Sequence, residues 1–204
     1  MINKKDIETE RTIVEFRNYV TIVKSIVNDC KEERHKGIVK KGIYKVFVDE
    51  IIPLSLFCIK NYPENYRVLP KLGNQGYDAI IKDEDGNHVE YLEITSPHDG
   101  LKEANDAKLV VGRGYGETET GDSGDDLRDM FSIVLGICNK KAIKDYNDCS
   151  LVIVIDFSPP FKEEEPTYKQ IISELEEKIV KIKFNVKKIY LLVIPLGMVK
   201  RIYG

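Results

Sequence analysis

Residues 77–95 have the sequence YDAIIKDEDGNHVEYLEIT, and this stretch decides the fold. Two runs within it, 77–82 and 89–95, alternate apolar and polar side chains as half-buried strands do. Between them lies Asp85-Gly86, the strongest short-range signal for a hairpin, because a type I′ turn needs positive φ at both central residues. The stretch therefore predicts an antiparallel β-hairpin.

The register of this hairpin brings two acidic residues together. A two-residue loop at 85–86 pairs Glu84 with Asn87. The same register places Asp78 directly opposite Glu93, with Cβ atoms roughly 4.5–5.5 Å apart, which is destabilising for like charges unless something compensates. A divalent cation is the simplest compensation. The competing interpretation is a solvated hairpin with two surface acids, or a one-residue shift in register that separates them.

The alternation also divides the hairpin into two faces. Thr95 falls on the face of the two acids, two residues beyond Glu93. The opposite face is predicted to belong to the core and comprises Tyr77, Ala79, Ile81, Leu92 and Ile94.

Length and composition favour one globular domain. The chain has 204 residues, of which 42% are hydrophobic and 32% charged. We expect a single domain over 1–204, with a helical N-terminal part at 1–62 and an α/β core at 63–204. No apolar run approaches bilayer length and no signal-peptide core follows Met1, so we expect a cytoplasmic protein with no membrane segment. The net charge of −3 means that nucleic acid would have to bind a local patch.

The cysteines and histidines do not predict a zinc site. The four cysteines have no CxxC spacing, and the three histidines are not clustered with them. Cys58 and Cys138 lie in apolar stretches, so we expect buried, reduced thiols.

The remaining sequence predicts helices and strands around the hairpin. Helices are expected at 7–30, 44–62, 101–111, 126–146 and 167–183, with Pro53 bending the second or opening a new helix there, and Asp125 or Asp126 as the N-cap of the fourth. Residues 31–41 are expected to form a loop or frayed helix end. Strands are expected at 66–69, on an edge, and at 151–157 and 189–194, whose apolar runs indicate burial on both faces. This order predicts an α/β protein with a mixed sheet flanked by helices.

The hairpin, with Asp78 on one strand and Glu93-Ile94-Thr95 on the next, resembles the PD-(D/E)xK restriction-endonuclease-like nuclease superfamily. In that family, adjacent strands carrying an acid and a (D/E)xK tripeptide are followed by a helix and a further strand. The resemblance covers roughly residues 50–157 and implies a three-layer restriction-endonuclease-like core. Two residues depart from the pattern: Tyr77 stands at the proline position and Thr95 at the lysine position.

The resemblance implies metal-dependent phosphodiester hydrolysis. Asp78 and Glu93 would hold Mg²⁺ or Mn²⁺, since magnesium takes one or two carboxylates and keeps several waters. The family lysine orients the attacking water or stabilises charge in the transition state, and Thr95 has no charge with which to do so.

Other residues complete the site that the resemblance implies. Some family members move the lysine to a neighbouring helix, and Lys102 and Lys141 are the candidates here. Lys141 also fits a solvated helix C-terminus that complements the helix dipole. In the family a glutamate often comes from an upstream helix, and Glu50 is the best candidate, ahead of Glu15 and Glu64.

A glycine-rich run at 112–116, Gly-Arg-Gly-Tyr-Gly, offers nucleic-acid contacts. Arg113 and Tyr115 could bind a polyanion by charge and a base by stacking, if the loop folds over the site. The run lacks the GxGxxG spacing of dinucleotide-binding loops. His98, just after the second strand, is a candidate proton carrier.

The leading hypothesis is a metal-dependent deoxyribonuclease, an endonuclease-like hydrolase of restriction, repair or phage-defence type, with DNA as partner. A homodimer or a partner subunit is compatible with the sequence. The first alternative keeps the nuclease fold but is a catalytically degenerate binding or structural module. The second is a small-ligand or nucleotide-binding α/β domain that uses the glycine loop. The first two differ in whether a lysine reaches Asp78 and Glu93.

Overall fold

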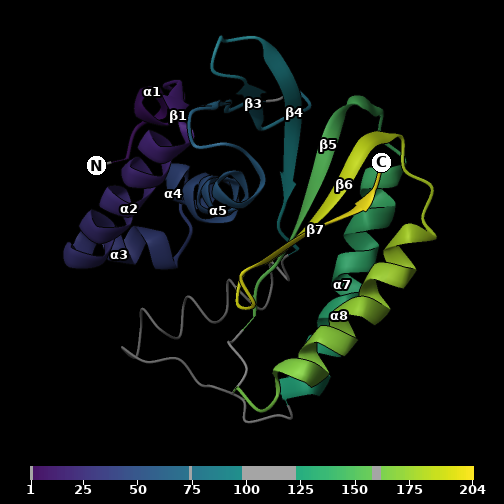
Figure 1. The fold of residues 1–204 in the computed structure, drawn as a ribbon. Coiled ribbons are helices and arrows are strands. Elements are labelled where there is room, and N and C mark those ends of the chain that lie inside the picture. The colour runs from purple at the N-terminus through teal and green to yellow at the C-terminus, as the bar shows by residue number, and fades with distance from the viewer. Residues whose placement is uncertain (1, 74, 98–122, 158–161) are drawn as a thin grey trace.

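The computed structural model describes residues 2–73, 75–97, 123–157 and 162–204. Within these ranges the strands form one seven-stranded sheet in chain order (Figure 1). Neighbouring strands from β1 to β4 are antiparallel, β4, β5 and β6 run parallel, and β7 is antiparallel to β6. The strands are β1 Arg11–Thr12, β2 Arg67–Pro70, β3 Ala79–Lys82, β4 His88–Thr95, β5 Tyr146–Ile155, β6 Val186–Val193 and β7 Met198–Tyr203.

Helices cover both faces of this sheet, which gives three layers (Figure 1). One face is covered by helices from the N-terminal part: α1 Lys4–Ile7, α2 Ile13–Asp29, α3 Lys31–Ile38, α4 Ile43–Val46, the π-helix η1 Phe47–Ile51 and α5 Ile52–Asn61. The other is covered by α7 Ser123–Ala142 and α8 Glu165–Val180. The predicted α/β class, with a mixed sheet flanked by helices, is confirmed. No helix in the described ranges is long and apolar enough to cross a bilayer.

The central strands are apolar on both sides because each side faces a separate core. In β5, Val152 and Val154 pack toward the N-terminal helices. Leu151, Ile153 and Ile155 alternate with them and pack against α7 and α8. This alternation explains the continuous apolar run that predicted a doubly covered strand.

Local sequence signals account for several of the observed helix boundaries. Thr12 and Glu15 form a reciprocal capping box that begins α2. Pro53 lies in the first turn of α5, where its missing N–H is tolerated, as expected for a proline that opens a helix. Cys58 and Cys138 are free and buried, which confirms the expectation for these thiols.

Some predicted elements are wrong. The expected loop at 31–41 contains α3, whose Lys, Glu and Arg residues are good helix formers. α7 begins at Ser123, ahead of the predicted caps Asp125 and Asp126. The strand expected at 66–69 forms as β2, but it is not an edge strand, since it lies between β1 and β3. The prediction missed β1 because a strand of two residues has no recognisable sequence pattern. The predicted helix at 101–111 lies outside the described residues.

The turn of the β3–β4 hairpin differs from the predicted two-residue loop. Asp83 N–H donates to the Asn87 carbonyl oxygen at 2.9 Å, so the loop holds the three residues 84–86. Gly86 adopts φ 86°, which glycine allows without steric cost. The Asp83 carboxylate accepts the Asn87 N–H at 2.8 Å and closes the turn.

A second irregularity cancels the first. The register shifts by one residue between Ile81 and Lys82, so the next pairs are Ile81 with Glu90 and Ala79 with Leu92. These pairs are the ones that the two-residue loop predicted. The bulge therefore restores the faces of the hairpin, and Ala79, Ile81, Leu92 and Ile94 are buried in the N-terminal core as expected.

Leu92 fixes the orientation of β4 through that core, where its side chain is fully buried. We expect Leu92→Ala to lower the free energy of unfolding by about 2–5 kcal/mol in urea titrations, because the cavity cannot collapse completely. Ile22→Ala on α2, where 59% of the side chain is exposed, is the matched control and should cost less than about 0.5 kcal/mol. Equal effects of the two substitutions would contradict this orientation of β4.

Candidate active site

Glu93 on β4 forms an ion pair with Lys141 near the end of α7. The pair is largely enclosed, with 13% of the Glu93 side chain and 19% of the Lys141 side chain exposed. At the start of β5, Tyr146 donates its hydroxyl to Glu93 Oε1 at 3.3 Å, and Lys141 Nζ lies 3.4 Å from that hydroxyl. Three elements thus meet at one carboxylate, and Lys141 is not a solvated helix end.

Asp78 lies one residue before β3 and is bonded to β4. Its N–H donates to the Leu92 carbonyl oxygen at 2.7 Å, and its carboxylate accepts the Ile94 N–H at 2.7 Å. The regular β3–β4 ladder begins only at Ala79, so Asp78 is not paired with Glu93 in that ladder. The two hydrogen bonds to Leu92 and Ile94 fix the position of Asp78 instead. The acid is nevertheless held on the two residues that flank Glu93.

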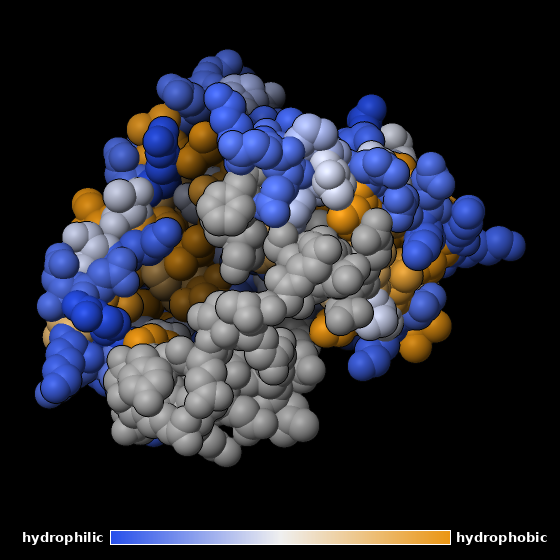
Figure 2. All heavy atoms as spheres, turned by 90° about the horizontal axis from the view of Figure 1, so that it is seen from below, coloured by the Kyte–Doolittle hydropathy of each residue, from blue (hydrophilic) through white to orange (hydrophobic). Residues whose placement is uncertain are grey.

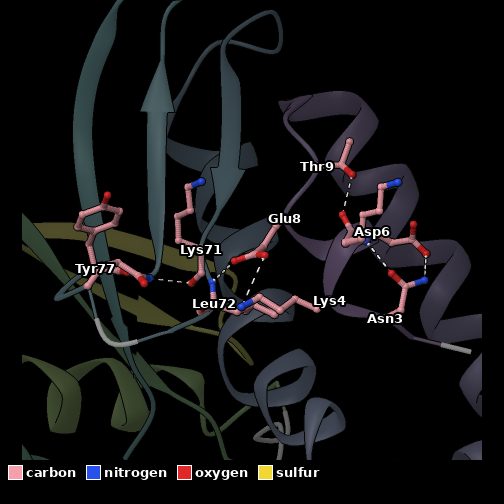
Figure 3. A network of polar contacts seen from close by, with 10 residues as sticks. Asn3, Lys4, Asp6, Glu8, Thr9, Lys71, Leu72 and Tyr77 are labelled. Atoms are coloured by element: carbon pink, nitrogen blue, oxygen red, sulfur yellow. Dashed lines mark hydrogen bonds and ion pairs between the residues drawn. The ribbon is translucent and has the colours of Figure 1, made fainter.

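The loop before Asp78 is tied to the N-terminal helix. Lys4 Nζ donates to the Leu72 carbonyl oxygen at 3.1 Å, and Leu72 N–H donates to Glu8 Oε1 at 2.9 Å (Figure 3). Farther along the loop, Gln75 Nε2 donates to the Tyr77 carbonyl oxygen at 2.7 Å. These contacts hold the backbone that leads into the acid.

Tyr77 does not join the core as the alternation predicted. Its ring contacts that of Tyr91, with centroids 4.6 Å apart. Tyr91 lies two residues before Glu93 and therefore shares the face of the acids. The reason is that the strand starts after Tyr77, at Ala79, so the alternation does not extend to it.

Glu50 reaches the same cluster from the π-helix η1. Burial raises the pKa of its carboxyl, and the charge of Glu93 raises it further, which places the two acids within electrostatic reach. Ser96, just after β4, donates its hydroxyl to the Asp49 carbonyl oxygen at 2.6 Å and joins η1 to the end of that strand. π-helical turns occur frequently at functional sites.

The electrostatics of the cluster are unbalanced. Burial and the charge of Glu93 raise the pKa of Asp78 to about 7, although the bond from Ile94 opposes the shift. Burial disfavours the Lys141 ammonium, but its bond with Glu93 outweighs this and raises the pKa of the lysine. Asp78 and Glu50 therefore add two carboxyl groups within electrostatic reach of the Glu93–Lys141 pair, an excess of acid that a cation would stabilise.

The donor set fits a hard cation that retains water. Within the described ranges, no group of three or more His, Cys, Asp or Glu side chains is arranged to hold a metal ion. Mg²⁺ needs only one or two carboxylates and keeps its remaining ligands as waters, so Asp78 and Glu93 suffice. Oxygen donors of this kind suit Mg²⁺ and Mn²⁺ better than softer metals.

Thr95 lies on β4 opposite Ile153 of β5 and is buried. Its Oγ1 has no hydrogen-bond partner in the part of the chain that the structure describes. It adds no charge to the cluster.

The other predicted residues do not join this group. Glu15 caps α2, and Glu64 is exposed after α5. Lys102, Arg113, Tyr115 and His98 lie outside the described residues. Tyr146 was missed, because a tyrosine at the junction of a helix and a strand has no distinctive pattern, although it follows Lys141 by five residues.

None of the family models, curated proteins and solved structures compared with this chain matches it. The assignment of the site therefore rests on its own geometry.

A separate pocket of about 210 Å³ lies among the N-terminal helices. Figure 2 shows apolar side chains over these helices on the face seen from below. The lining of this pocket includes Val27, Ile38, Phe47 and Ile52, and it does not include Asp78, Glu93 or Glu50.

The raised pKa of Asp78 predicts a specific pH dependence of stability. An acid with a folded-state pKa of about 7 and an ordinary value near 3.9 favours folding below pH 4, and this contribution is lost as pH rises through 7. In chelator, the Asp78 carboxyl should contribute a loss of stability to wild type between pH 4 and pH 8. The free energy of unfolding of Asp78→Asn, measured in urea, should fall less than that of wild type over this range, by up to about 4 kcal/mol.

Glu177→Gln, at an exposed acid on α8, is the control and should follow wild type. Identical pH profiles for Asp78→Asn and wild type would contradict the coupled cluster.

Proposed function

We propose that this protein is a metal-dependent deoxyribonuclease of the PD-(D/E)xK type, in which Lys141 supplies the ammonium that Thr95 lacks. The observation that carries the proposal is the ion pair between Lys141 and Glu93, beside the carboxylate of Asp78. Lys141 thus reaches the acids from α7, whereas Glu93 lies on β4.

The order of the elements supports this assignment. Asp78 precedes β3, Glu93 lies on the antiparallel β4, and α7 leads to β5, which is parallel to β4. Glu50 comes from an upstream helical segment. This is the arrangement expected for an acid, an acidic strand, a following helix and strand, and a helical glutamate in that superfamily.

Asp78 and Glu93 are the residues that would hold Mg²⁺ or Mn²⁺. A bound divalent cation supplies polarisation of a phosphoryl oxygen and a lowered pKa for an attacking water. Lys141 and Tyr146 both donate to Glu93 Oε1, so Oε2 is the oxygen that we assign to the cation. Asp78, with a pKa of about 7, would release a proton on binding a cation near neutral pH.

Lys141 has a separate role in this proposal. Its raised pKa keeps the ammonium charged at neutral pH. A fixed ammonium in a largely enclosed site can stabilise the negative charge that develops on the phosphoryl group in the transition state. Tyr146 orients Glu93 by its hydroxyl and is a positioning residue.

The degenerate module remains the second candidate because Thr95 is buried and carries no charge. It shares the metal site with the nuclease but lacks turnover. Cleavage and metal binding must therefore be measured separately.

Cleavage of plasmid and single-stranded DNA in Mg²⁺ or Mn²⁺ tests the nuclease. We expect Asp78→Ala to abolish it. Lys141→Met should lower kcat roughly 10²–10³-fold, as loss of one transition-state donor does, while the Mn²⁺-induced rise in Tm persists. Lys140→Met, at the exposed neighbour on α7, is the matched control and should cleave like wild type.

Three results would reject parts of the proposal. Cleavage that survives both Asp78→Ala and Glu93→Ala would place catalysis elsewhere. Equal rates for Lys141→Met and Lys140→Met would remove the lysine from the mechanism. A metal-induced rise in Tm without any cleavage by wild type would favour the degenerate module.

A further inference from the structure

An open groove of about 400 Å³ adjoins the acidic cluster. Tyr146 belongs to both, since it lines the groove and donates to Glu93. Tyr91, on one wall, is two residues from Glu93 along the same face of β4, a separation of about 6.6 Å. The lining includes Tyr77, Tyr91, Asp145, Tyr146, Asn147 and Asp148.

One wall of the groove is aromatic. The ring of Tyr91 contacts that of Tyr77 at 4.6 Å and that of His88 at 4.2 Å between centroids. Neither tyrosine belongs to the two apolar cores among the described residues, and His88 is exposed. Figure 3 shows Tyr77 extending away from the contacts that tie its loop to α1. The two tyrosine rings therefore pack against each other along the groove rather than filling either core.

Hydrogen-bond acceptors from the end of the α7–β5 turn and from the start of β5 also line the groove. Asp145 and Asp148 supply carboxylates there, and Asn147 supplies an amide. Asp145 Oδ1 is oriented by the Asn147 N–H at 3.2 Å and by Asn185 Nδ2 at 2.9 Å. No lysine or arginine occurs among the described residues that line the groove, so it disfavours phosphate.

Aromatic rings and carboxylates in one groove match a nucleobase with an exocyclic amino group. Bases stack on tyrosine rings regardless of sequence, and a carboxylate accepts a hydrogen bond from an amino group such as cytosine N4. A thymine lacks the exocyclic amino group and offers only its ring N3–H as a donor, so it satisfies fewer of these acceptors.

We propose that this groove binds an unpaired, amino-bearing base of a DNA strand whose backbone passes the acidic cluster, a proposal that rests on the nuclease function. The base stacks on Tyr77, whose ring packs against Tyr91, and its amino group faces Asp145 and Asp148. The base belongs to a nucleotide next to, or one removed from, the phosphate at Glu93. Because a base inside a duplex cannot present its face to a ring, the substrate strand is single-stranded or locally unpaired.

Binding measurements that do not need turnover test this groove. The probes are oligo-dC and oligo-dT of twelve nucleotides carrying a terminal fluorophore, followed by anisotropy with Ca²⁺ in place of Mg²⁺. Wild type should bind oligo-dC more tightly than oligo-dT. Tyr77→Ala should weaken oligo-dC binding roughly 5- to 150-fold, the effect of losing one stacked base, whereas Tyr77→Phe should change it less than about 2-fold.

Three further variants separate stacking from base choice and from folding. Asp148→Asn should remove most of the preference for oligo-dC while leaving oligo-dT binding unchanged. Tyr203→Ala, at an exposed tyrosine on β7, is the matched control and should bind like wild type. Tyr77→Leu serves as a second variant that keeps apolar volume without a ring, and it should behave as Tyr77→Ala does at an unchanged Tm.

The outcomes distinguish this groove from the nuclease proposal. Equal oligo-dC binding by Tyr77→Ala, Tyr77→Leu and Tyr77→Phe, or no binding by wild type, would overturn the groove even if DNA is cleaved. A ring-dependent preference for oligo-dC without any cleavage would uphold the groove as a binding site and reject catalysis.

Discussion

The ion pair between Lys141 and Glu93 is the interaction on which the rest of the site depends. It joins the end of α7 to β4 through two residues that are 48 positions apart in the chain. Enclosing two charges costs desolvation energy, and such pairs often stabilise a fold no better than apolar residues would. The pair also leaves Asp78 and Glu50 as additional carboxyls with raised pKa values. An arrangement that is poor for stability and suited to binding a cation indicates function.

Glu90 on the same strand shows what a purely structural acid looks like. It is buried on the other face of β4, where it accepts hydrogen bonds from Tyr62 and Ser150 and pairs with Lys188. Burial alone would raise its pKa, but these donors lower it. Three residues farther on, Glu93 accepts from Lys141 and Tyr146 among the described residues and has two acidic neighbours. The contrast separates an acid whose charge is balanced by its donors from acids whose mutual repulsion raises the pKa of Asp78 and Glu50.

The sequence predicted which residues of the hairpin share a face, but only because two unpredicted irregularities cancel each other. The expected turn is wrong by one residue, and the bulge beside Ile81 corrects the register by one residue. Neither irregularity has a clear sequence signal, because both depend on Asp83 and Gly86 forming a local hydrogen-bonded loop. Lys141 was one of two candidate lysines, and only the path of α7 could choose between it and Lys102, which lies outside the described residues.

What the sequence could not predict lies where tertiary contacts override local pattern. Tyr77 does not lie on the core face as predicted, because β3 begins two residues later, at Ala79. The π-helix that presents Glu50 has no signature in its five residues. Tyr146 joined the site because β5 begins there, beside the end of α7. Each of these placements depends on packing between elements far apart in the chain, which periodicity does not encode.

The central claim is that Asp78, Glu93 and Lys141 form one charge-coupled cluster. Its most direct test is an NMR titration of the Asp78 side-chain carboxyl carbon in metal-free protein. The pKa should be about 7 in wild type. It should fall in Glu93→Gln, because that substitution removes the neighbouring negative charge. A pKa near the ordinary value of about 3.9 in wild type, or one that Glu93→Gln leaves unchanged, would contradict the account.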